Sequence, residues 1–140
     1  MNNTDTIEKL FHKFQSYSAL PIRLVIGVHL IIGTQDNVLS WERMLEFESF
    51  LTLQGMPFPL LSAILSVYAQ FISGILFIVG WKTRWAALIM ITNFIVAILL
   101  VHIGDSYQGT FPAIMMLAGS IFLLLNGSGK LSFDDRRRAQ

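Results

Sequence analysis

The chain has 140 residues, of which 54% are hydrophobic and only 14% are charged. A water-soluble domain of this length distributes charge over most of its surface, but residues 49–81, 85–104 and 106–129 contain no Asp, Glu, Lys or Arg. The net charge of +1, with one basic run at residues 136–138, gives no reason to expect a nucleic-acid partner. Because cysteine is absent, disulfides, thiolate nucleophiles and iron–sulfur clusters are excluded.

Residues 1–18 predict an amphipathic helix at the start of the chain. Its apolar side chains recur at helical spacing and share one face: Ile7, Leu10, Phe11 and Phe14. Lys9 and Lys13 lie off that face. A helix of this kind lies in the plane of a membrane interface, so we expect residues 1–18 to be an interfacial segment and not a membrane span.

Four later segments are long and apolar enough to cross a membrane, for which a helix needs about 20 mainly apolar residues. They are residues 20–39, 60–80, 85–103 and 112–126. Pro57 and Pro59 mark the start of the second span and Pro112 that of the fourth, because proline is tolerated in the first turn of a helix. Gly80 provides a stop for the second span.

The first span is the least regular, because it contains Arg23 and Asp36. Both lie within a turn or so of its ends, where a polar group can reach the headgroup region, so we interpret the segment as transmembrane. The alternative is a short helix lying in the interface. The predicted fold is therefore all-α: one membrane-embedded four-helix bundle covering residues 1–140, with a tail at residues 127–140.

The distribution of Lys and Arg predicts the orientation of this bundle. All the basic residues except Arg43 fall on one side if both termini are placed in the cytoplasm, as the positive-inside rule requires. We therefore expect a multi-pass protein of the inner (cell) membrane. On the outer side, residues 40–53 predict a second amphipathic segment. Glu48 falls on its apolar arc, either at the water boundary or pointing into a cavity.

Polar side chains inside the spans need partners, because an unpaired polar group in hydrocarbon is costly. On the first span, His29, Gly33 and Asp36 share a face that we expect to turn inward. The other spans place further small or polar candidates near the middle of the bundle: Ser66, Gln70, Ser73 and Asn93. These residues could form interhelical hydrogen bonds, or they could line a small polar pocket for a ligand head group together with His29.

Four residues are candidates for an outer-side cluster: Asp36, Glu48, His102 and Asp105. No span carries two histidines or carboxylates at metal-ligand spacing, so no metal site is predicted. Haem ligation by His29 and His102 is disfavoured, because their depths along the helices differ by roughly 10 Å at 1.5 Å per residue. We therefore expect no intrinsic cofactor.

Several short motifs occur in order along the spans: Arg23-x-x-x-Gly27, Gly55-Met56-Pro57, Gln70-x-x-x-Gly74, Gly80-Trp81-Lys82-Thr83-Arg84, Val101-His102 and Asn126-Gly127-Ser128-Gly129. In this order the chain resembles the DoxX-like family, named after the small membrane subunit of a thiosulfate:quinone oxidoreductase, over about residues 20–134. The resemblance implies a four-helix membrane bundle with a link to membrane quinones. Gln70 stands where the family pattern has a glutamate, and Asp36 lies near a common lysine position.

These observations lead to a first hypothesis, a redox-associated membrane protein that contacts a quinone or similar lipophilic ligand. His29 and Gln70 would bond a quinone carbonyl, while Phe71, Phe77 and Phe94 surround the apolar tail. Its partners would be the lipid bilayer and a redox subunit that supplies electrons, with homo-oligomerisation and catalytic activity left open. The alternatives are a non-enzymatic membrane scaffold and, less favoured, a small-solute transporter.

Overall fold

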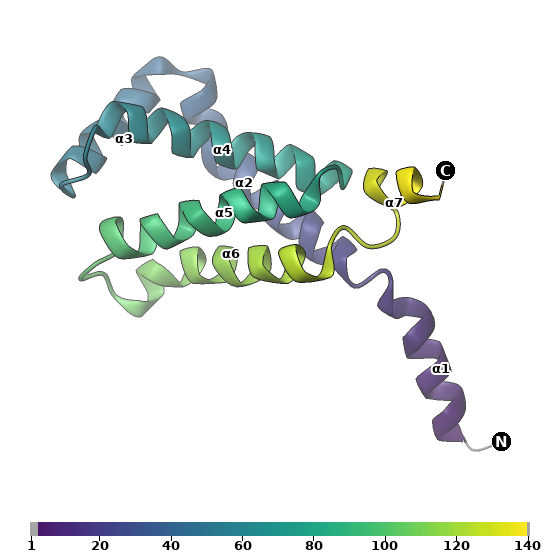
Figure 1. Cartoon of the computed structure of the whole chain (residues 1–140). Coiled ribbons are helices and arrows are strands. Elements are labelled where there is room, and N and C mark those ends of the chain that lie inside the picture. Colours follow the sequence, from purple (N-terminus) through teal and green to yellow (C-terminus); the bar gives the residue numbers. More distant parts are fainter. Residues whose placement is uncertain (1–2, 140) are drawn as a thin grey trace.

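The computed structural model describes the backbone of residues 3–139 and, apart from Arg138, the side chains from Ile7 to Ala139. The regular elements of this part of the chain are all helices, and it contains no strand. In chain order its elements are α1 (Asn3–Gln15), α2 (Ala19–Leu39), α3 (Trp41–Leu53), α4 (Pro59–Val79), α5 (Thr83–Val96), the π-helical segment η1 (Ala97–Val101), α6 (Tyr107–Asn126) and α7 (Phe133–Arg138) (Figure 1).

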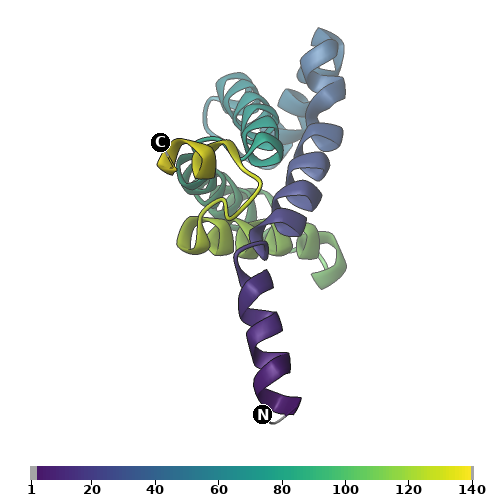
Figure 2. The same ribbon diagram turned by 90° about the vertical axis from the view of Figure 1, so that its right-hand side faces the viewer.

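Four helices are long and apolar enough to cross a membrane: α2, α4, α5 continued by η1, and α6. The first packs against α4, α4 against α5, α5 against α6, and α6 returns to α2, which closes the bundle (Figures 1 and 2). Both termini lie at one end, which we call the terminal end. The opposite, distal end carries α3, which packs on α2 and α4.

The second span begins and ends as the sequence predicts. Pro59 is its first residue, and Gly80 follows Val79 with a φ of +71°. This left-handed conformation suits glycine, and the Gly80 N–H donates to the Leu76 carbonyl at 2.8 Å. The helix α4 therefore has its predicted extent to within a residue at each end.

The fourth span differs from its prediction, because α6 begins at Tyr107 and not at Pro112. Ser106 is in extended conformation, and its Oγ accepts a hydrogen bond from the Gly109 N–H at 3.3 Å, which is a typical N-cap. Pro112 then falls within the second turn. The capping serine, and not the proline, sets the start of this helix.

The closely packed face of α2 is next to the face that the sequence predicts to turn inward. A Cβ placed on Gly27 would lie 2.8 Å from the Gly74 carbonyl oxygen, and one on Gly74 equally close to the Gly27 carbonyl oxygen. The two glycines therefore allow the backbones of α2 and α4 to touch, and this contact fixes which face of α2 is buried. That face carries Arg23, Ile26, Gly27, Leu30 and Thr34. Of the predicted inward residues, His29 and Gly33 are exposed by surface area but line a cavity between the helices, and Asp36 is exposed outside it.

Two hydrophobic clusters form the interior. The larger joins α2, α4, α5 and α6 and includes Leu30, Phe77, Met90, Phe94, Met116 and Leu123. The smaller joins α3, α4 and η1 at the distal end and includes Met44, Leu51, Val67 and Val101. The two clusters are separate, and a cavity lies between them.

Candidate functional site

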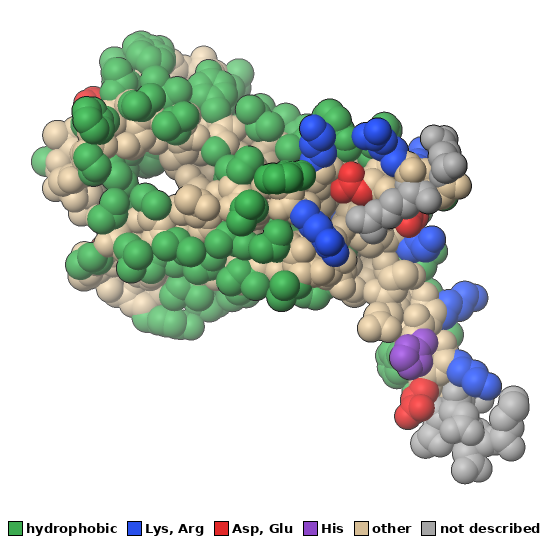
Figure 3. Space-filling model, in the orientation of Figure 1, with side chains coloured by type: hydrophobic (Ala, Val, Ile, Leu, Met, Phe, Trp, Pro, Cys, Tyr) green, Lys and Arg blue, Asp and Glu red, His purple; other side chains and the backbone are tan. Residues whose placement is uncertain are grey.

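A cavity of about 730 Å³ lies between the two hydrophobic clusters in the distal half of the bundle. Phe94, Ala113 and Met116 of the larger cluster line it together with Leu51 and Val101 of the smaller one. Helix α3 contributes aromatic side chains at the distal side, and in Figure 3 a gap is visible between α4 and α5 in this half. The volume lies within the range usual for small-molecule sites.

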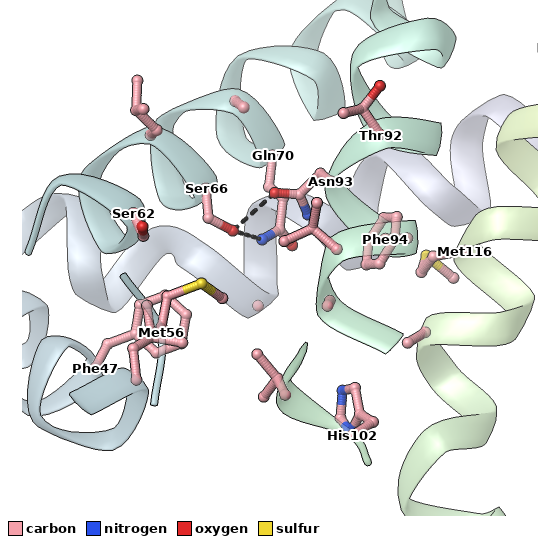
Figure 4. A pocket seen from close by; sticks show the side chains of 18 of the residues that line it. Phe47, Met56, Ser62, Ser66, Gln70, Thr92, Asn93, Phe94, His102 and Met116 are labelled. Carbon is pink, nitrogen blue, oxygen red and sulfur yellow. Dashed lines mark hydrogen bonds between the residues drawn. The ribbon is translucent and has the colours of Figure 1, made fainter. Parts of the chain in front are cut away.

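One wall of this cavity carries a hydrogen-bonded polar group that bridges α4 and α5. The Ser66 hydroxyl donates to Asn93 Oδ1 at 2.9 Å, and Gln70 Nε2 donates to Ser66 Oγ at 3.0 Å (Figure 4). All three side chains line the cavity. The sequence offered interhelical bonding and a ligand pocket as alternatives for these residues, and the arrangement is compatible with both. The Gln70 carbonyl and the Asn93 amide N–H groups remain for a further partner.

Two histidines also line the cavity, one from each side of the bundle. His102 follows η1, and its Nδ1 lies 2.8 Å from Asp105 Oδ2. A carboxylate at one ring nitrogen fixes the orientation of the ring and the use of the other nitrogen. His29 comes from α2, where Gly33 also lines the cavity, and within the described residues no hydrogen bond to its ring is found.

The remaining predicted residues lie elsewhere. Ser73 is buried in the helix packing, and like Phe71 and Phe77 it does not line the cavity. Of the four outer-side candidates only His102 and Asp105 come together, while Asp36 and Glu48 are outside the cavity. Among the side chains that the structure describes, no three His, Asp or Glu residues form a group that could hold a metal ion.

A second polar site, at the terminal end, was missed by the sequence analysis. Arg23 was expected to reach the headgroup region, but it is 0% exposed. Its Nη1 donates to the Ser128 carbonyl at 2.8 Å and its Nη2 to the Leu131 carbonyl at 3.1 Å. A side chain on Gly80 would collide with the guanidinium, so the absence of a Cβ there makes room for it. Arg23 therefore fixes the C-terminal segment to the bundle.

Asp134 provides the second attachment of this segment. Its carboxylate accepts hydrogen bonds from the backbone N–H groups of Lys82, at 2.9 Å, and Thr83, at 3.1 Å. It thus caps the start of α5, where unpaired N–H groups favour a negative charge. Its own N–H donates to the Gly80 carbonyl at 3.0 Å. The segment after α6 is consequently folded against the α4–α5 turn over these residues.

The family of the chain follows from comparison with known proteins. The DoxX family model matches residues 18–103, which include α2, the Gly27–Gly74 contact and the bonded polar group on α4 and α5. Neither the curated proteins nor the solved structures give a match. The matched region covers more than half of the chain and contains three of the four helices long enough to cross a membrane. The protein is accordingly an integral, multi-pass membrane protein that belongs to the DoxX family.

Proposed function

We propose that the protein holds a lipophilic ligand of the quinone class in the distal cavity and acts as a redox-associated subunit or accessory protein. The observation that carries the proposal is the cavity itself. It is lined by apolar side chains of two separate clusters, and one wall has a small set of polar groups. Sites for small lipophilic molecules combine these two features, since apolar walls bind the body and polar groups orient the head.

The hydrogen-bonding groups in the cavity suit a ligand that carries carbonyl oxygens. Asn93 Oδ1 is occupied by Ser66, so the amide N–H groups of Asn93 are its available donors. His102 offers a second donor or acceptor, because Asp105 occupies only one of its ring nitrogens. A quinone has two carbonyl acceptors and would match such donors. Gln70 bonds Ser66 and so helps to hold the hydroxyl that orients Asn93.

The position of the cavity favours entry of the ligand from the bilayer. Leu65 of α4 and Ile89 and Val96 of α5 line the cavity and are exposed on the surface of the bundle. These apolar residues lie on spanning helices, so lipid would surround them. A ligand dissolved in the membrane would reach the cavity between α4 and α5 without crossing water.

The basic residues support an orientation with the terminal end in the cytoplasm. The protein would then be an inner-membrane protein whose cavity lies in the outer half of the bilayer. Electrons for a bound quinone would come from a partner redox subunit, since the serine, asparagine, glutamine and histidine side chains that line the cavity are not electron carriers.

Thermal unfolding in detergent with added decylubiquinone tests the proposal. A ligand at a hundred times its Kd stabilises the folded state by about 2.7 kcal/mol, so the unfolding temperature should rise measurably. Asn93→Leu should abolish most of this rise. Ser73→Ala is the matched control, because Ser73 is also a buried polar residue of the bundle but does not line the cavity. Absence of any rise in the wild-type protein would reject a quinone ligand.

A further inference from the structure

A cleft of about 330 Å³ lies at the terminal end, between the start of α5 and the C-terminal segment. It is separate from the distal cavity and shares no residue with it. The residues that line it are Lys82, Arg84, Trp85, Gly127, Ser128, Asp134 and Arg137. Three of them are cations, which is a high local concentration of positive charge for a chain with so few charged residues.

The fold brings these cations together from two distant parts of the sequence. Lys82 and Arg84 belong to the turn and first residues of α5, whereas Arg137 lies in α7. The attachments described above place α7 beside that turn: Arg23 holds the carbonyls of Ser128 and Leu131, and Asp134 caps α5. In Figure 1, α7 lies next to the turn between α4 and α5. The positive cleft is therefore a consequence of the docked C-terminal segment.

Little negative charge is available to neutralise these side chains. The single carboxylate in the cleft, Asp134, uses both oxygens to accept backbone N–H groups. Arg84 donates to the Leu125 carbonyl at 3.3 Å, which is a neutral acceptor. Within the described residues, Lys82, Arg84 and Arg137 take part in no ion pair. An anion that entered the cleft would meet positive groups that are not already paired.

The surroundings of the cleft are those of a membrane–water interface. Trp85 is 68% exposed at its edge, and the neighbouring Trp81 lies under the Lys82 ammonium at 5.3 Å. Exposed tryptophans are enriched at the headgroup level of membrane proteins. Leu125, whose carbonyl accepts the hydrogen bond from Arg84, is 74% exposed near the end of α6, and Leu88 and Ile89 of α5 are exposed as well. An anionic group with an apolar extension would satisfy both parts of this surface.

We propose that this cleft binds the phosphate of an anionic membrane phospholipid. The phosphate lies among Lys82, Arg84 and Arg137, and the acyl chains run along the exposed apolar surface of α5 and α6. Clusters of basic residues beside membrane spans recognise anionic lipid headgroups in this manner. Free inorganic phosphate has the same head group chemistry but gains nothing from the apolar surface, so the lipid is the preferred ligand.

The test is a titration of the purified full-length protein with phosphatidylglycerol in neutral detergent, followed by native mass spectrometry. Arg137→Gln should weaken phosphatidylglycerol binding about five-fold, which is the effect expected of one cation near a lipid surface. Arg136→Gln is the matched control, because it removes the same charge from the adjacent residue of α7, which does not line the cleft. Arg84→Gln should weaken binding to a similar extent as Arg137→Gln.

Three results would overturn the proposal. Equal losses in Arg136→Gln and Arg137→Gln would show diffuse charge attraction instead of a site. Equal binding of phosphatidylcholine would show that the negative charge is not recognised. Complete displacement of the lipid by millimolar inorganic phosphate would identify free phosphate as the ligand. The proposal is independent of the quinone, because Arg137→Gln leaves the distal cavity intact and should not change the decylubiquinone response.

Discussion

The terminal and distal halves of the bundle are built from the same four helices but are packed differently. In the terminal half, Gly27 and Gly74 let two backbones touch, and the buried Arg23 ties in the C-terminal segment. In the distal half the interior splits into two clusters with a cavity between them. The contrast places the close packing in one half and the cavity, our proposed ligand site, in the other.

Replacement of Arg23 should have the largest effect on stability. Arg23→Leu removes two charge-assisted hydrogen bonds and leaves the Ser128 and Leu131 carbonyls without their donor. Bonds to charged groups contribute about 1.5–3 kcal/mol each, so we expect a loss of about 3 kcal/mol or more, measured by thermal or denaturant unfolding in one detergent. Arg43→Leu, which breaks an exposed ion pair with Glu46, is the control and should leave stability unchanged. Similar unfolding curves for both variants would show that Arg23 does not fix the tail.

A pair of glycine substitutions on α2 tests the close packing directly. In Gly27→Ala the new methyl group would overlap the Gly74 carbonyl and the Ile78 side chain, which should cost about 1–3 kcal/mol. In Gly33→Ala the methyl group meets no atom within 4 Å. Alanine is the better helix former, so this variant should be unchanged or slightly more stable. The relevant measurement is the difference in unfolding free energy between the two; a difference near zero would contradict the rotation of α2.

Loss of the Asp134 cap should be smaller. Asp134→Ala leaves the Lys82 and Thr83 N–H groups without their acceptor, and loss of an N-cap typically costs about 1 kcal/mol. The tail should also become more accessible to protease, which mass analysis of the fragments would detect. Asp135→Ala is a fair comparison, since Asp135 lies on the same helix but pairs with Lys130 at 3.5 Å. Equal protease sensitivity in the two variants would count against the docked tail.

The smallest change in stability is expected in the distal half. Ser66→Ala removes the hydroxyl that joins Gln70 to Asn93, and interhelical bonds of this kind contribute about 0.6 kcal/mol on average in membrane proteins. The same variant should nevertheless weaken decylubiquinone binding, because Asn93 is no longer oriented. Unfolding and ligand titration on one sample separate these effects. A large loss of stability with unchanged ligand affinity would mean that the polar group only holds α4 to α5.

The sequence predicted the features that depend on residues close together in the chain, such as the limits of a helix. The limits of α4 follow from Pro59 and Gly80, and the grouping of Ser66, Gln70 and Asn93 follows from helical spacing at similar depth. The start of α6 differs from the prediction at Pro112, because the Ser106 side chain caps the helix five residues earlier.

Longer-range features could not be predicted in this way. The partners of Arg23 are backbone carbonyls more than a hundred residues away. Every residue has a backbone carbonyl, so the types of residue in the sequence do not indicate which ones accept a hydrogen bond. The face of α2 carrying His29 was predicted correctly in part: His29 and Gly33 line the cavity, but Asp36 does not. The close contact of α2 with α4 is made by Gly27 and Gly74 and could not be predicted from polar periodicity. The interfacial position of α1 stays a prediction; its exposed Ile7, Leu10, Phe11 and Phe14 are consistent with it.

The hollow distal half is tested most directly by native mass spectrometry of the protein extracted gently from its own membrane. We expect the wild-type chain to retain a lipophilic molecule with the mass of a quinone. Asn93→Leu should lose it, and Ser73→Ala should keep it. A wild-type spectrum that contains only the chain and phospholipid, unchanged by either substitution, would contradict a quinone-binding cavity.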